Sequence, residues 1–251
     1  MINYTWGDET GYGLLTNYYN TTIKNCVFEE GNISSSYSRG ILLNYSNHST
    51  IHNTTIMSKT SQSSGLRLES CDNANISLNN ISTHESGSYW DSNDAVVLID
   101  SSNNSVTDNE LATFGNYGSE ALLLDGGSNN NVIQNNNIHS ETNSANIILI
   151  DGNYVSETSS PKNNLIYDNV INGTGTGTDA IELNDLVGGG NNVSGNNIST
   201  KGYGIFIVNV NGECSGDAIE NNNYINSKPI NVTNKLNSLT YDYQDYTGYG
   251  Q

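Results

Sequence analysis

The chain repeats a short apolar signature at a nearly constant interval. A small residue is followed by an apolar-x-apolar pattern, with looser copies at 13–16 and 146–149. The close copies are GILL (40–43), GLRL (65–68), AVVL (95–98), ALLL (121–124), AIEL (180–183) and GIFI (204–207). The first apolar position recurs every 24 to 34 residues, with an average of about 27. A repeat of this length indicates one structural unit stacked many times.

A second signature pairs apolar residues five positions apart. The pairs are Ile23/Phe28, Ile51/Ile56, Ile76/Ile81, Val106/Leu111, Ile133/Ile138, Ile166/Ile171 and Val193/Ile198. Because side chains alternate between the two faces of a strand, an odd separation requires a bend if both members face inward.

Asparagine recurs three residues after the first member of these pairs. The positions are Asn79, Asn109, Asn136, Asn169, Asn196 and Asn222, with Cys26 and Thr54 in the two earliest copies. Asparagine tolerates the left-handed conformation that a bend can need, and stacked asparagines can bond to one another as a ladder. We therefore expect these residues to form one corner of a repeated coil.

These patterns predict an all-β fold, a right-handed parallel β-helix of about eight coils (rungs) with about 27 residues per coil. The expected division is an N-terminal edge or cap (1–11), a single β-helix domain (12–235) and a C-terminal tail (236–251) that leads into a further segment. The blades of a β-propeller are longer than this repeat, which argues against that fold.

Composition narrows the classes of partner. Eight Lys and Arg against 26 Asp and Glu give a net charge of −18, which argues against nucleic acid, because phosphate binding needs basic patches. No apolar stretch is long enough for direct membrane insertion. The three cysteines, Cys26, Cys71 and Cys214, have neither disulfide-framework nor metal-motif spacing.

Two segments, GLRLESCDNANISLNNI (65–81) and AVVLIDSSNNSVTDNEL (95–111), carry a family resemblance. They resemble the pectate-lyase-like right-handed parallel β-helix repeat superfamily, and within it the NosD-type repeats, named for copper binding or for carbohydrate binding and sugar hydrolysis, of archaeal or bacterial surface proteins. The resemblance implies a β-helix and an extracellular or cell-surface location. Polygalacturonase and epimerase motifs are absent. Copper binding is not carried over, because the four His are scattered and only two Met exist.

Stacking makes distant residues neighbours, so candidate sites are read as rows. Asp94 and Glu120 are expected one coil apart, where like charges raise the pKa of one of them. Two insertions, 83–94 and 151–163, lengthen single repeats and bring acids and aromatics together. The candidate catalytic residues are Arg67, His84, Glu85, Asp94 and Glu120. The candidate glycan-binding residues are Tyr89, Trp90, Asp91 and Asp179. Calcium is the one candidate cofactor, with the ligands Asp94, Glu120, Asp125 and Asp151; the alternative is a solvated acidic rim.

An apolar row is expected on the outer face of the repeated strand. It comprises Leu15, Leu42, Val97, Leu123, Ile148 and Phe206. Such a strip indicates a covering flap, a protein–protein contact or a ligand groove. Candidate partners are therefore a polysaccharide or glycan, and a second copy of the chain in a homo-oligomer or a head-to-tail assembly.

These observations leave three functions open. The first is an extracellular or cell-surface module that is carbohydrate-binding or structural. The second is a self-assembling filament or surface-layer subunit. The third is an enzyme, a polysaccharide lyase or glycoside hydrolase acting on a surface polysaccharide. The scarcity of Lys and Arg argues against the enzyme, since anionic polysaccharides are normally held by cations.

Overall fold

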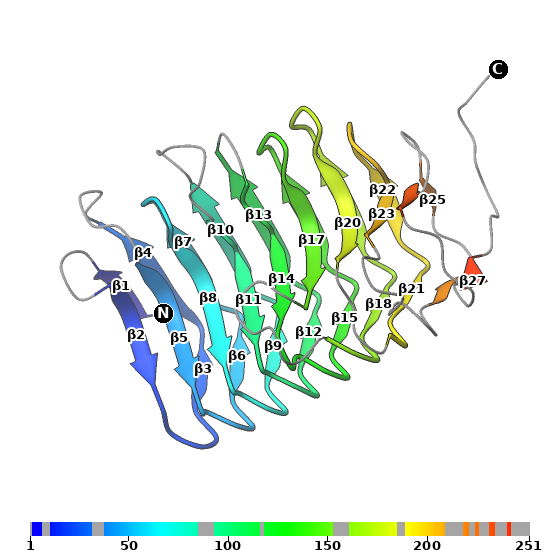
Figure 1. Cartoon of the computed structure of the whole chain (residues 1–251). Helices are drawn as coiled ribbons and strands as arrows, with labels where there is room; N and C mark the ends of the chain where they lie inside the picture. The colour runs from blue at the N-terminus through cyan, green and yellow to red at the C-terminus, as the bar shows by residue number, and fades with distance from the viewer. Residues whose placement is uncertain are drawn as a thin grey trace.

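In a computed structural model, the chain forms three parallel sheets, here called sheets A, B and C (Figure 1). The structure describes residues 2–6, 11–31, 38–84, 93–115, 118–152, 161–184, 189–208, 218–220, 224–225, 231–233 and 240–241. Each sheet contains nine strands, one more than the eight coils expected. The chain passes from A to B to C and then begins the next coil, so every strand pairs with its counterpart one coil away.

The strands are short and regularly spaced. Sheet A contains β1 (Ile2–Trp6), β4 (Cys26–Glu30), β7 (Thr55–Ser58), β10 (Asn80–His84), β13 (Glu110–Phe114), β16 (Asn137–Ser140), β19 (Val170–Gly173), β22 (Asn197–Ser199) and β25 (Tyr224–Ile225). Sheet B contains β2 (Tyr12–Thr16), β5 (Arg39–Asn44), β8 (Ser64–Glu69), β11 (Val96–Ile99), β14 (Leu122–Asp125), β17 (Asn146–Asp151), β20 (Asp179–Asn184), β23 (Ile205–Val208) and β26 (Asn231–Thr233). Sheet C contains β3 (Thr22–Lys24), β6 (Thr50–His52), β9 (Asn75–Ser77), β12 (Ser105–Thr107), β15 (Val132–Gln134), β18 (Leu165–Tyr167), β21 (Asn192–Ser194), β24 (Ala218–Glu220) and β27 (Thr240–Tyr241).

The predicted fold class, an all-β parallel β-helix, is confirmed. The small-apolar-x-apolar signature forms sheet B, and the pairs of apolar residues five apart join sheet C to sheet A. Ile76, for example, lies in β9 and Ile81 in β10, and both are fully buried. One continuous core of aliphatic side chains runs through the stack. The division into cap, domain and tail stays a prediction, although β1 already pairs with β4 in sheet A.

The corner between sheets C and A uses two adjacent residues with different tasks. The first has a positive φ; this row is Asn25, Asn53, Leu78, Asp108, Asn135, Asp168 and Gly195. The second is the ladder residue, which is buried in every coil from Thr54 to Asn196, whereas Cys26 in the first copy is partly exposed. Asn109, for instance, donates its backbone N–H and its side-chain Nδ2 to Asn136 Oδ1, at 2.9 and 3.0 Å. The predicted Asn ladder is confirmed, but the left-handed residue is its predecessor and not the ladder asparagine itself.

A second ladder, which the sequence analysis missed, lies at the corner between sheets B and C. Its members are Asn104, Asn131, Asn164 and Asn191, all buried. Asn131 Nδ2 donates to Asn164 Oδ1 at 3.1 Å, and Asn164 Nδ2 donates to Asn191 Oδ1 at 2.9 Å. Each strand of sheet C in this region is therefore held between two asparagines, in patterns such as NSVTDN (104–109).

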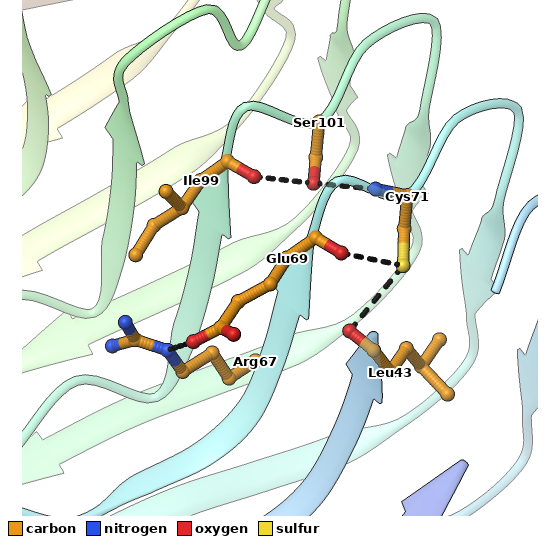
Figure 2. A network of polar contacts seen from close by, with 6 residues as sticks. All are labelled: Leu43, Arg67, Glu69, Cys71, Ile99 and Ser101. Carbon is orange, nitrogen blue, oxygen red and sulfur yellow. Dashed lines mark hydrogen bonds and ion pairs between the residues drawn. The ribbon is translucent and has the colours of Figure 1, made fainter. Parts of the chain in front are cut away.

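Cys71 occupies a row of serines at the same corner. The row contains Ser46, Cys71, Ser101 and Ser128. The thiol lies 3.3 Å from the carbonyl oxygen of Leu43 (Figure 2). Its sulfur accepts the N–H of Ser46 at 3.1 Å. Ser101 Oγ accepts the N–H of Cys71 at 3.0 Å. Cys71 therefore does the structural work of a serine.

Strand β17, which precedes the insertion at 151–163, is shifted in register relative to the predicted repeat. Strand pairing aligns Leu122 with Ile148 and Leu123 with Leu149. Ile148 thus points into the core, where it is fully buried, and Leu149 takes its expected place on the outer face. The placement of Ile148 in the outer strip was wrong because strand pairing shifts the register of β17 by one residue relative to the apolar pattern.

We expect Asn136→Ala to destabilise the protein strongly. The change removes four hydrogen bonds, since Asn136 Oδ1 accepts two bonds from Asn109 and Nδ2 donates to Val106 O and Asn169 Oδ1. At about 1 kcal/mol per net bond, the expected loss is about 2–4 kcal/mol in the free energy of unfolding. Urea denaturation measures it. Asn137→Ala, an exposed neighbour bonded to Glu110, is the control and should cost less than about 1 kcal/mol.

Cys71 should resist thiol reagents in the folded protein. Its side chain is fully buried, and burial raises the pKa of its thiol, whereas Cys26 is partly exposed. In a Cys214→Ser background, a colorimetric disulfide reagent should label Cys26 first and Cys71 only after unfolding. Equal labelling rates at both positions in the native state would contradict the described packing.

Candidate functional site

A backbone irregularity at the start of sheet B turns a row of polar side chains outward. The N–H groups of two consecutive residues, Gly65 and Leu66, both donate to the next coil, at 3.0 and 2.9 Å. In that coil Ala95 and Val96 both belong to the core. In a regular strand only every second side chain points inward, so two consecutive inward residues break the alternation. Asp94, which precedes them, and Val97, which follows them, therefore both lie on the outer face of sheet B.

Asp94 and Glu120 lie one coil apart on this face, as the sequence predicted. The N–H of Glu120 donates to Asp94 Oδ1 at 3.0 Å, and the two carboxyl groups are hydrogen-bonded to each other. Their exposed fractions are only 5% and 7%. Burial raises the pKa of both groups, and the charge of Asp94 raises that of Glu120 further, well above its usual range. Asp94 and Glu120 therefore form a buried pair of interacting carboxyl groups.

Arg67 lies in the neighbouring outer row and is half-buried. Its Nε donates to Glu69 Oε1 at 2.5 Å on the same strand, and Figure 2 shows this ion pair beside the Cys71 row. The guanidinium also lowers the pKa of Asp94, although burial of that carboxyl outweighs it. Arg39, one coil earlier, lies 5.7 Å from the centre of the Tyr12 ring. Burial and the charge of Arg67 lower the pKa of Arg39.

Further along the same face, a carboxyl and aromatic group gathers around Glu182. Burial raises the pKa of Glu182 to about 7, and the charges of Asp179 and Asp151 add to the rise, while a hydrogen bond from Asn146 opposes it. Asp179 Oδ1 accepts the N–H of Tyr203 at 2.5 Å. The Tyr203 ring stacks on Phe206, with centroids 5.4 Å apart. We call Asn146, Asp179, Glu182, Tyr203 and Phe206 the Glu182 group.

The candidate catalytic set does not assemble on one sheet. Arg67, Asp94 and Glu120 share the outer face of sheet B or its approach, but His84 ends β10 in sheet A. There it stacks on Phe114, with ring centroids 4.6 Å apart, and Phe114 also contacts His139. The pKa of His84 is lowered, chiefly by burial. Glu85, Tyr89, Trp90 and Asp91 lie outside the described residues.

The metal hypotheses find no preformed site in the described part of the chain. No group of three or more His, Cys, Asp or Glu side chains there is arranged to hold a metal ion. Asp125 and Asp151 are adjacent in sheet B and buried, but they lie at the ends of their strands, whereas Asp94 and Glu120 precede the strands β11 and β14. Of the residue types that bind copper, Cys71 is hydrogen-bonded within the row of serines and His84 packs on Phe114. The described residues therefore do not fit a copper site, and calcium stays a prediction.

The outer apolar strip is mostly buried and is not an exposed patch. Val97 and Leu123 pack with Ile99 and Leu149 in a small cluster, each at most 6% exposed. Leu42 is 5% exposed, Phe206 is partly buried, and only Leu15 is largely exposed, at 52%. The contact function of this strip stays a prediction, and its middle is not free surface in the described structure.

Sequence reasoning missed most of the Glu182 group. Glu182 and Tyr203 stood in the expected rows but were not selected, and Asn146 was displaced from its row by the register error at β17. The available signal was a pair of equivalent positions in adjacent repeats, where the acids Asp179 and Glu182 of one repeat are followed by the aromatics Tyr203 and Phe206 of the next.

Stability should fall as the pH rises through the titration of Glu182. The unfolded carboxyl has a pKa near 4.5 and the folded one about 7, so the folded state binds the proton more tightly between these values. Stability is therefore highest below about pH 4.5 and its loss is complete above about pH 7, by about 2 kcal/mol after allowance for partial exposure. Asp94 and Glu120 act in the same direction.

Urea denaturation at about pH 5 and about pH 8 measures this difference. Glu182→Gln should reduce it, because the amide cannot ionise. Glu110→Gln removes one negative charge at an exposed position and serves as the control. A Glu182→Gln protein with the full wild-type pH dependence would show that this carboxyl does not contribute.

Comparison with known proteins places the chain among β-helix proteins. Residues 3–116 match the family described as periplasmic copper-binding protein (NosD). No curated protein matches significantly in sequence. The Dettilon tailspike protein is similar in structure, with a TM-score of 0.60 and 15% identity over 88% of this chain and 43% of that one. DFA-IIIase from Arthrobacter chlorophenolicus A6, crystallised without its lid, gives a TM-score of 0.59 and 14% identity over 90% of this chain and 55% of the enzyme.

The chain thus spans about half the length of these two proteins, and the likeness to them is one of fold. The described residues contain no helix long and apolar enough to cross a membrane. The expected resemblance to NosD-type repeats is confirmed for the N-terminal part of the stack, and the same coil geometry continues beyond it. The chain is therefore a parallel β-helix repeat domain, and its residues 3–116 are similar to the NosD-type repeats.

Proposed function

We propose that the chain is an extracytoplasmic carbohydrate-binding module whose glycan lies on the Glu182 group. The observation that carries the proposal is the stacked pair of Tyr203 and Phe206 directly beside a row of carboxyl and amide groups. Tyr203 is 38% exposed, so its ring is accessible from solvent.

The chemistry of the Glu182 group suits a hydroxylated ring. An aromatic face offers apolar contact to the C–H side of a pyranose, and a tyrosine adds a polar hydroxyl at its edge. Carboxylates and amides accept or donate hydrogen bonds to sugar hydroxyls. With a pKa of about 7, Glu182 is present in both protonation states near neutrality, so it offers a donor as well as acceptors.

The comparisons agree with this proposal without deciding it. The family that matches residues 3–116 is described as periplasmic, which supports a location outside the cytoplasm. The two solved structures belong to larger proteins, of which this chain covers 43% and 55%. An activity of any longer protein that contains this module is likewise a proposal.

A second candidate function, glycoside hydrolysis, is favoured by Asp94 and Glu120. Two carboxyls with separated pKa values are the groups that hydrolases use as acid and base or nucleophile. Arg67 lies close enough to influence Asp94. Their low exposure argues against this function, since a catalytic acid must reach the glycosidic oxygen.

A glycan array followed by calorimetric titration of the hits tests the proposal. Tyr203→Ala with Phe206→Ala should weaken binding by about tenfold or more, because the stacking surface is lost. Leu165→Ala removes a partly exposed apolar side chain from sheet C and is the matched control. Thermal melting verifies folding of each variant.

A wild-type chain that binds no glycan would refute the carbohydrate-binding function. A reducing-end assay on the bound glycans separates the two candidates. Product that disappears in Glu120→Gln would favour the hydrolase.

A further inference from the structure

A cluster of exposed aromatic side chains stands at the corner between sheets B and C in the first two coils. Tyr18, Tyr19 and Tyr45 are 75%, 67% and 69% exposed. The ring of Tyr19 lies 5.0 Å from that of His48, tilted by 55°. We call these four residues the corner cluster. Scattered exposed tyrosines need no explanation, but here three lie at the same corner of two adjacent coils, and one of them contacts His48.

Tyr45 occupies a position where the rest of the row uses small or polar residues. Its φ is 54°, and the equivalent left-handed residues in later coils are Ser70, Asp100 and Gly126. Its N–H donates to Glu69 O, as the N–H of Ser70 donates to Ile99 O. A bulky residue with positive φ is an outlier, since glycine, asparagine and aspartate adopt this conformation at lower cost. The local backbone therefore does not call for a tyrosine.

His48 and Tyr19 depart from their rows in the same way. His48 has a φ of 58° in a row that otherwise contains Asn20, Asn73, Asn103, Asn130, Asn163 and Gly190. Tyr19 precedes Asn20 as Asn47 precedes His48, and the row continues with Asp72, Ser102 and Asn129. In those later coils a side-chain oxygen accepts the N–H of the next coil, as Asn47 Oδ1 does from Asp72 at 2.8 Å. A tyrosine ring does not supply that oxygen at the same place.

Neither core packing nor backbone geometry calls for Tyr19, Tyr45 and His48, so these side chains are candidates for contact with a ligand. Neutral amides flank these positions in the sequence; Asn17 and Asn20 are exposed, and Asn44 and Asn47 are half-buried. Exposed ring faces with amide donors and acceptors, and with no lysine or arginine among the four residues of the cluster, match a neutral hydroxylated ring. A net charge of −18 opposes a nucleic acid or an anionic lipid surface.

We propose that the corner cluster is a second glycan-binding site, which takes a neutral pyranose by stacking on Tyr18, Tyr19 and Tyr45. The inference rests on the proposed carbohydrate-binding function but on none of the residues of the Glu182 group. In sheet B six strand spacings separate β5 from β23, which amounts to about 29 Å along the stack. A polysaccharide that reaches both sites is held bivalently, and its apparent affinity exceeds that of either site alone.

The row pattern supplies variants that remove the rings without harming the fold. Tyr19→Asn, Tyr45→Asn and His48→Asn each install a residue that later coils use in that row or that its left-handed backbone prefers. The triple variant should melt at or above the wild-type temperature. Leu78→Asn makes the same kind of change at the corner between sheets C and A, where Leu78 is 55% exposed with a φ of 55°, and is the matched control.

The probes are cellohexaose, mannohexaose and chitohexaose, with hexagalacturonate as the anionic comparison, in calorimetric titrations of the whole chain. The protein is produced in a host without N-glycosylation, because Asn20 and Asn47 begin Asn-x-Thr/Ser sequences. We expect the wild type and Leu78→Asn to show two binding events with a neutral probe. The triple variant should lose one event or weaken it by about tenfold, and the Tyr203→Ala, Phe206→Ala variant should lose the other.

Each alternative outcome shows which of the two proposals fails. If the triple variant keeps every wild-type binding event, the corner cluster is not a glycan site, while the proposed function survives through the Glu182 group. If Leu78→Asn weakens binding as much as the triple variant does, the effect is not local to the corner cluster and the inference falls. If the wild type binds none of these probes but binds other glycans at the Glu182 group, the second site alone is refuted. If it binds no glycan at all, both proposals fail.

Discussion

The hydrogen bond from a backbone N–H at one corner to a side-chain oxygen one coil away is the interaction on which the rest of this structure depends. Sheets satisfy their own backbone groups, but a corner interrupts the pairing and leaves buried donors that need partners. The two ladders of asparagine, with serine and Cys71 in related roles, supply those partners coil after coil. Only with the corners satisfied can a core of single aliphatic rows hold three short strands per coil together.

Much of this architecture could be predicted from the sequence, because each coil repeats the same physical requirement. The odd spacing of Ile76 and Ile81 indicated the bend, and the asparagine between them indicated the ladder. The second ladder was overlooked because Asn104 and its counterparts lie in a region already crowded with asparagine, where composition hides position. The register at β17 was misjudged because two apolar residues, Ile147 and Ile148, fit the inward row equally well, and only strand pairing distinguishes them.

The candidate sites were less predictable than the fold for a related reason. The sequence places Asp94 and Glu120 one coil apart, which is enough to expect interacting carboxyls. It does not reveal that both are buried, because burial of an outer face depends on segments that pack over it from elsewhere in the chain. His84 was grouped with Arg67 by proximity in sequence, whereas the two belong to different sheets. The Glu182 group and the corner cluster become visible only when equivalent positions of successive coils are compared.

The corner between sheets C and A has a consequence for how such a chain changes length. From β6 to β22, two residues always separate a strand of sheet C from the next strand of sheet A, as in Leu78 and Asn79. The other two corners vary, and both long insertions of the sequence, 83–94 and 151–163, fall there. Because the spacing at this corner is constant, each coil stays in register with its neighbours. New loops, and with them new recognition surfaces, can be inserted along two edges of the rod, while the constant spacing at the third edge preserves the strand register.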